Sequence, residues 1–131
     1  MERLLDESCD PRRMGTAALA FMGDAVYSML VREHLCCRSI CKAGKLHSEA
    51  VAMVCCESQA AHMLRIMDML TDEERAVYMR GRNTHTSHVP KNSGVGDYRS
   101  ATGLEALFGF LYLDGQLARM RELFERLTEG E

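Results

Sequence analysis

Apolar side chains recur at helical spacing in one segment of the chain after another, and this periodicity most strongly constrains the fold. Between residues 14 and 35, five apolar residues follow the i, i+3, i+4, i+7, i+8 spacing of one buried stripe: Met22, Ala25, Val26, Met29 and Leu30. Residues 46–70 repeat this spacing through Ala50, Val51, Val54, Ala61, Leu64 and Met67. No segment gives a convincing strand pattern, so we predict an all-α protein.

Capping and turn signals delimit the remaining elements. A turn is expected at Lys42–Lys45, which contains Gly44. Thr71 and Glu74 form a capping box, which predicts a short helix as far as about Arg82.

A further stripe and a last amphipathic helix complete five predicted helical segments. The stripe comprises Leu104, Leu107, Phe108, Leu111 and Tyr112. Asp114 and Gly115 break it, and the last helix should end near Leu127.

Length and composition limit the chain to one domain. It has 131 residues, 47% apolar and 27% charged, which suits a soluble globular protein with a real core. We expect residues 1–131 to form a single domain. The longest uncharged stretch, Met14–Gly23, is half of the ~20 residues that a membrane span needs. The acidic N-terminus does not resemble an export signal, and the six cysteines do not resemble a disulfide framework, so we expect a cytoplasmic protein with reduced thiols.

Positive charge is concentrated in two segments, although the net charge is −3. Residues 11–45 hold six Lys or Arg against two acids, and residues 76–99 hold four against Asp97. If the fold brings the segments together, they form a patch that can follow a phosphate backbone. Charge counting alone favours the alternative, a set of solvated helix faces.

A long segment without helical periodicity separates the third and fourth helices. It runs from Asn83 to Asp97, carries Lys91 and is flanked by basic residues, so it suits a phosphate-rich ligand, the alternative being a simple connector. His85 and His88 within it suggest a zinc site only weakly, because no cysteine pair has finger-like spacing.

Two isolated carboxylates are the candidate chemical groups. Asp24 is the only charge between Arg13 and Arg32, and Glu105 is the only charge between Arg99 and Asp114. Each lies beside small residues on an otherwise apolar helix, as a hard divalent cation requires of its oxygen ligands. Pattern alone does not show that they meet, and it favours carboxylates that cap a helix or pair with an Arg.

Five motifs resemble those of a known family. Residues 20–27, Ala-Phe-Met-Gly-Asp-Ala-Val-Tyr, resemble the signature helix of the ribonuclease III catalytic domain, and residues 101–109, Ala-Thr-Gly-Leu-Glu-Ala-Leu-Phe-Gly, resemble its second metal-binding helix. The similarity is greatest to the short branch, Mini-ribonuclease III. Residues 80–83, 90–92 and 97–99 correspond to further motifs of that branch in the same order, so the resemblance covers nearly the whole chain.

The resemblance implies a helical homodimer that cleaves double-stranded RNA with Mg²⁺, needs no small organic cofactor and matures the large-subunit (23S) ribosomal RNA precursor. Its products would carry 5′-phosphate and 3′-hydroxyl ends. By position, Asp24 and Glu105 would be the catalytic and metal-binding carboxylates. Larger ribonuclease III enzymes also have acidic residues where this chain has Ala20 and Thr102, and they carry a separate RNA-binding domain for which this chain is too short.

Substrate binding would then fall to the catalytic domain itself. Our candidates for contacts to the RNA backbone are Arg80, Arg82, Lys91, Asn92 and Arg99. An exposed apolar pair, Phe108 with Leu111 or Phe21 with Met22, would form the dimer interface, the alternative being that these residues belong to the core. The alternative functions are a catalytically silent RNA-binding or dimerisation module of the same fold, and a helical thiol or metal-storage protein.

Overall fold

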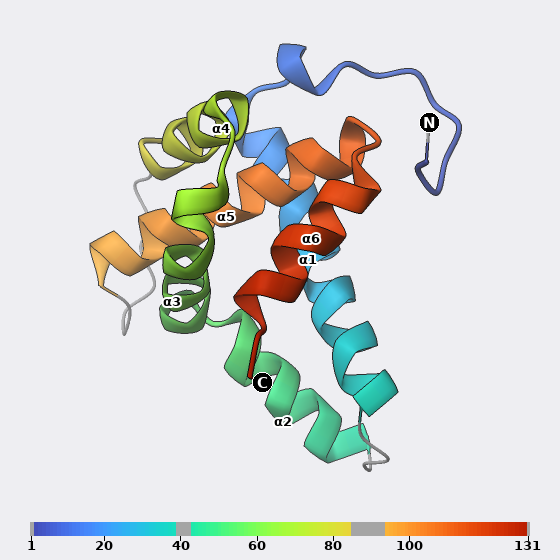
Figure 1. The fold of residues 1–131 in the computed structure, drawn as a ribbon, viewed down its shortest axis with the longest axis vertical. Helices are drawn as coiled ribbons and strands as arrows, with labels where there is room; N and C mark the ends of the chain where they lie inside the picture. The colour runs from blue at the N-terminus through green and yellow to red at the C-terminus, as the bar shows by residue number, and fades with distance from the viewer. Residues whose placement is uncertain (1, 39–42, 85–93, 131) are drawn as a thin grey trace.

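The computed structural model describes residues 2–38, 43–84 and 94–130, and within these ranges it is helical, with no strand (Figure 1). Within these three ranges it contains six α-helices and two short 3₁₀ turns. The α-helices are α1 (Thr16–Arg38), α2 (Ala43–Val54), α3 (Cys56–Ile66), α4 (Asp72–Arg82), α5 (Val95–Leu113) and α6 (Leu117–Leu127). The 3₁₀ turns are η1 (Pro11–Arg13) and η2 (Met67–Met69). The predicted all-α class is confirmed. No helix among the described residues is both long and apolar enough to cross a membrane.

Helix α5 runs through the middle of the molecule, and α1, α3, α4 and α6 pack around it (Figure 1). Every residue from Ala106 to Tyr112 is buried, so this half of the helix is enclosed on all sides. A helix that is apolar all round is typical of the centre of a bundle. The other helices therefore take their positions from the residues of α5.

Two glycines bring the backbones of α1 and α5 into direct contact. A Cβ atom at Gly23 would lie 1.6 Å from the backbone oxygen of Glu105 and 2.9 Å from the nitrogen of Gly109. A Cβ atom at Gly109 would lie 2.0 Å from the backbone oxygen of Leu19. Only a residue without a side chain fits at either position, so the crossing point is fixed by the backbone itself.

A second pair of glycines fixes α4 against another face of α5. A Cβ atom at Gly81 would lie 2.8 Å from the Cα of Gly103, and one at Gly103 would lie 2.6 Å from the ring of Tyr78. Gly103 and Gly109 are six residues apart, which at 100° per residue places them on different sides of the helix. Helix α5 is thus held by close contacts on two faces.

Side chains complete the attachment of α4. The predicted capping box is present: Thr71 Oγ1 accepts from the Glu74 backbone N–H, and Glu74 Oε1 accepts from the Thr71 N–H. Arg119 of α6 also pairs with the buried Glu74 carboxylate, at 2.8 Å. Burial would raise the pKa of Glu74, but Arg119 and Thr71 together lower it. The N-terminus of α4 is therefore tied to α6.

The buried face of α1 differs from the predicted stripe. The residues that α1 buries are Leu19, Gly23, Val26, Tyr27 and Val31. Of the predicted stripe, Val26 is buried as expected and Met22 and Leu30 pack partly buried against the core, whereas Ala25 and Met29 are exposed. The predicted buried face was rotated away from the observed one because the pattern did not count Gly23 and Tyr27 as apolar. Both residues nevertheless lie at the contact with α5. Phe108 and Leu111 are fully buried in the core, so the expectation that they form a dimer interface is wrong.

The predicted helix over residues 46–70 is two helices. Cys55 has extended backbone angles (φ −67°, ψ 158°) and separates α2 from α3. The two halves have different packing partners, because α2 contacts α1 whereas α3 contacts α5 and α6. A turn was also predicted at Lys42–Lys45, but α2 already begins at Ala43 and includes Gly44 and Lys45; Lys42 lies outside the described residues.

We predict that Gly23→Ala destabilises the protein by about 3 kcal/mol or more, because the new methyl group meets rigid backbone rather than a side chain that can move. Urea unfolding followed by circular dichroism measures the effect. Gly44→Ala is the matched control, since a Cβ atom there meets nothing within 4 Å. Equal stability of the two variants would contradict the close backbone contact.

Candidate functional site

The contact between α1 and α5 places Asp24 and Glu105 side by side. Asp24 directly follows Gly23, the residue that touches the Glu105 backbone. The two carboxyl groups interact through their charges and through a hydrogen bond. Residues 81 positions apart in the sequence thus meet, as the metal-site prediction required, because two glycines allow their helices to approach.

The pair combines an accessible carboxyl group with a more buried one. Asp24 is classed as exposed, whereas Glu105 is partly buried between the helices. Burial, the negative charge of Asp24 and the hydrogen bond that the carboxyl groups share raise the pKa of Glu105 to about 8, and a hydrogen bond with Gln59 opposes this rise. Near neutral pH, Glu105 is therefore protonated and can donate a hydrogen bond to Asp24.

A divalent cation suits this arrangement because it would replace the shared proton and balance both negative charges. Mg²⁺ is commonly held by one or two carboxylates, with water and substrate phosphate completing its coordination. Within residues 2–38, 43–84 and 94–130, no cluster of three or more His, Cys, Asp or Glu side chains is placed to hold a metal. Two protein ligands and an open side fit Mg²⁺ better than a closed structural zinc site.

The residues one helical turn before the two acids add no carboxylate. Ala20 precedes Asp24 on α1, and Thr102 precedes Glu105 on α5. The Thr102 hydroxyl group donates to the backbone oxygen of Tyr98 at 3.0 Å, within its own helix. The described part of the site therefore offers two acidic side chains.

Three of the predicted RNA-binding residues lie on the helices that carry or border the site. Arg80 and Arg82 flank Gly81, which packs against the α5 turn that precedes Glu105. Arg99 is exposed in the first turns of α5, six residues or about 9 Å along the axis before Glu105. Lys91 and Asn92 lie outside the described residues, as do His85 and His88 of the weaker zinc hypothesis.

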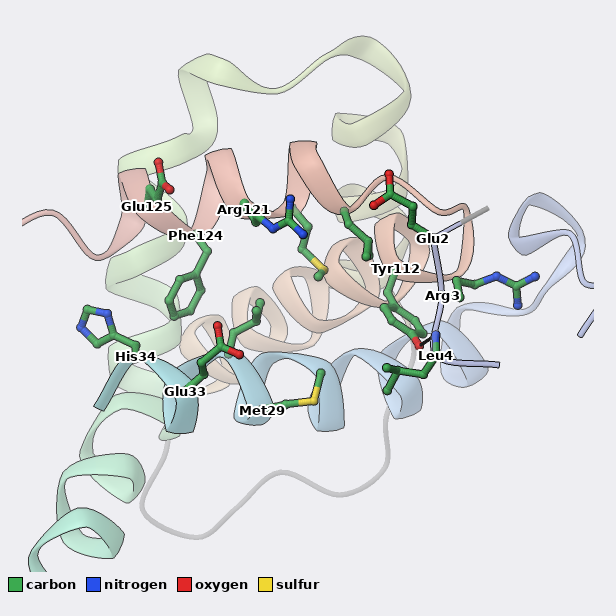
Figure 2. Close-up of a pocket in the computed structure, with 13 residues that line it drawn as sticks. Glu2, Arg3, Leu4, Met29, Glu33, His34, Tyr112, Arg121, Phe124 and Glu125 are labelled. Carbon is green, nitrogen blue, oxygen red and sulfur yellow. Dashed lines mark hydrogen bonds between the residues drawn. The ribbon is translucent and has the colours of Figure 1, made fainter. Parts of the chain in front are cut away.

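A separate groove lies between α1 and α6, and residues Glu2–Leu4 cross one end of it (Figure 2). Its volume is about 530 Å³, and its walls include Met29, Glu33 and Phe124. The Leu4 backbone N–H donates to the Tyr112 hydroxyl oxygen at 2.7 Å, which fastens the N-terminal segment across it. Neither Asp24 nor Glu105 lines this groove, so it is not part of the carboxylate site.

Sequence reasoning missed Gln59, which reaches the site from α3. This side chain is buried in the core, and it contacts Glu105. Helical periodicity does mark position 59 as inward-facing, because it precedes the buried Met63 by one turn. A polar residue at such a position is the signal that could have been used.

Comparisons with known proteins find similar sequences over most of the chain. The sequence profile described as the Ribonuclease III domain matches residues 17–116. Mini-ribonuclease 3 of Brevibacillus brevis is 41% identical over 125 residues, which are 93% of each chain. Mini-ribonuclease 3 of Streptococcus pneumoniae is 43% identical over 108 residues, 81% of this chain and 84% of the relative.

The fold also matches a solved structure. A crystal structure of a protein from Fusobacterium nucleatum superposes with a TM-score of 0.84 at 25% sequence identity. The match covers 94% of this chain and 95% of the other. The arrangement of helices is therefore shared with a chain that differs at three positions in four.

The raised pKa of Glu105 predicts how stability depends on pH. Between its ordinary value of 4.5 and about 8, the folded state binds more protons than the unfolded state, so this group's contribution to stability falls as pH rises through that window. Glu105→Gln removes the effect. In metal-free buffer we expect the variant to gain on the order of 1–3 kcal/mol over the parent between pH 5 and pH 8.

Urea unfolding at several pH values measures this gain. Asp68→Asn, which alters an exposed carboxylate on η2, serves as the control and should follow the parent. Parallel pH profiles for Glu105→Gln and the parent would contradict a shared proton at this site.

Proposed function

Because the chain belongs to the ribonuclease III family of endoribonucleases, we propose that it cleaves double-stranded RNA with Mg²⁺ in the cytoplasm and matures the ends of the large-subunit ribosomal RNA precursor. The observation that carries this proposal is the contact between Asp24 and Glu105 at the crossing of α1 and α5. Similarity to Mini-ribonuclease 3 proteins over most of the chain supports the choice of reaction.

In the proposed reaction, Asp24 and Glu105 hold the metal from two helices whose spacing cannot change. A bound magnesium ion supplies Lewis-acid chemistry there: it activates water for attack on the phosphodiester and neutralises charge on the leaving 3′ oxygen. Glu105 would bind the cation in its ionised form, with its proton released to solvent, so that both carboxylates could serve as ligands. Hydrolysis with the 3′ oxygen as the leaving group leaves 5′-phosphate and 3′-hydroxyl ends.

Basic side chains of the catalytic domain bind the duplex in this proposal. Arg80 and Arg82 at the end of α4 and Arg99 on α5 contact phosphate oxygens, and Lys91 and Asn92 are assigned to the same role from the sequence. Such contacts position an RNA helix without reading its bases. Choice of cleavage site then follows the shape of the duplex and its irregularities.

Cleavage of both strands requires two sites, which a homodimer provides. Phe21 supports such a dimer: it is 83% exposed on α1, one turn before Asp24. A large apolar side chain displayed beside the carboxylates is well placed to bury itself against a second copy. Its neighbour Met22 is partly buried in the molecule and contributes less exposed surface.

A catalytically silent module of the same fold is the competing function. The contact between the two carboxyl groups favours the enzyme, because a pair that repels when both groups are ionised becomes favourable once a cation binds between them. Cleavage assays separate the two functions directly, since a silent module binds duplex RNA without cutting it.

We predict that Asp24→Asn lowers the rate of magnesium-dependent cleavage of duplex RNA by about 100-fold or more. Loss of one metal ligand removes several kcal/mol of charge stabilisation from the transition state. A gel assay with a labelled duplex, with and without magnesium, measures the rate. Asp68→Asn is the matched control and should cut as fast as the parent. Unchanged cleavage by Asp24→Asn would refute the catalytic assignment.

We further predict that Phe21→Asp converts the protein from a dimer to a monomer, because a charge at this position cannot be buried in an apolar interface. Size-exclusion chromatography with light scattering measures the mass. Leu64→Asp is the control, since Leu64 is also a large apolar residue, is 77% exposed and lies on α3 rather than on α1. A parent that is already monomeric, or a Phe21→Asp variant that remains dimeric, would exclude this interface.

A further inference from the structure

Gln59 of α3 is a polar side chain buried behind the carboxylate pair. Only 2% of its surface is exposed. Its Nε2 atom donates to the backbone oxygen of Val54 at 3.0 Å, and its side chain also interacts favourably with the ionised Glu105 carboxyl group. Gln59 therefore links the end of α2 to the more buried of the two acids.

The orientation of the Gln59 amide is fixed by its neighbours. The backbone oxygen of Val54 can only accept a hydrogen bond, so the amino side of the amide must face it. The same amino group has a second N–H, which is available to donate to Glu105. A donor directed at a carboxylate favours the ionised form and restricts the directions in which it can point.

Stability alone does not account for an amide at this position. Gln59 Oε1 is buried and has no hydrogen-bond partner among the described residues. A buried acceptor without a partner costs about 1–3 kcal/mol, and an unbranched apolar side chain of similar size would avoid that cost. What the amide provides and an apolar residue does not is the contact with Glu105.

A second buried layer holds α3 rigidly below this contact. One turn further along each helix, the Tyr27 hydroxyl oxygen lies 2.8 Å from His62 Nδ1, and the Tyr27 ring packs edge-on against Phe108 at 5.4 Å between centroids. These residues follow Asp24, Gln59 and Glu105 by three positions each. These contacts join α1 to α3 and α1 to α5 within one helical turn of the three site residues.

We propose that Gln59 is a positioning residue for metal binding: its amide holds the Glu105 carboxylate turned toward Asp24, so that both groups face one cation. This inference rests on the proposed function, because it assigns Gln59 a role toward the same metal. It adds to that function a third helix, α3, which sets the orientation of a ligand without touching the metal or the RNA.

Gln59→Met tests the inference because methionine keeps the length of the side chain and removes its hydrogen-bonding groups. Calorimetric titration with magnesium, without RNA, should show a dissociation constant raised about 10-fold, the effect typical of losing a group that orients a metal ligand. The magnesium concentration for half-maximal cleavage should rise in proportion, while the KM for RNA stays unchanged. If Gln59→Met does not fold, Gln59→Leu is measured in its place.

Tyr27→Phe is the matched control, since it also removes a buried hydrogen bond from these helices but leaves Glu105 untouched. It should lower stability and leave the magnesium dissociation constant within about twofold of the parent. Unchanged magnesium binding by Gln59→Met would overturn the inference. Equal weakening by Tyr27→Phe would also overturn it, because general loosening of the helices would then explain both results.

An experiment that refutes the proposed function gives a different result from one that refutes the role of Gln59. A parent that neither binds magnesium nor cleaves RNA refutes the proposed function itself. The contact between Gln59 and Glu105 is then decided by a double-mutant cycle of Gln59→Met and Glu105→Gln in metal-free unfolding. Non-additive changes in the free energy of unfolding support the contact, and additive changes overturn it.

Discussion

Direct contact between the backbones of α1 and α5 is the constraint on which the rest of the structure depends. Gly23 and Gly109 let the helices approach until the backbone oxygen of Glu105 occupies the place of a Cβ atom at Gly23. That approach brings the Asp24 and Glu105 carboxyl groups together, and it creates the repulsion that a shared proton or a cation relieves. Fold and chemistry thus have one origin, since the contact that packs the core also assembles the site.

Much of the fold was predictable because its signals are local. Helical spacing identified the stripe of α5, and the Thr71 and Glu74 pair marked the start of α4. Asp24 and Glu105 could be selected as isolated charges on apolar helices, but their contact could not, because periodicity carries no information about which helices cross. The resemblance to ribonuclease III motifs supplied that link.

The features of the fold that the sequence did not predict depend on contacts between residues far apart in the chain. The buried face of α1 was misplaced because Gly23 packs by having no side chain, which no scale of hydrophobicity records. The break at Cys55 lies within a continuous apolar pattern and reflects two halves that pack on different helices. Gln59 and the Tyr27 and His62 pair have partners on other helices, and the sequence does not indicate which helices these are.

Glycines fix how α1, α4 and α5 are aligned, and this affects how far the sequences of proteins with this fold can diverge. Most helix pairs owe their alignment to interlocking side chains, so a change in core volume shifts them. Here four small positions, at residues 23, 81, 103 and 109, set the alignment by backbone contact. The surrounding aliphatic residues can therefore be exchanged without moving the two acids relative to each other. The geometry of the carboxylate pair is in this way insulated from changes in the core.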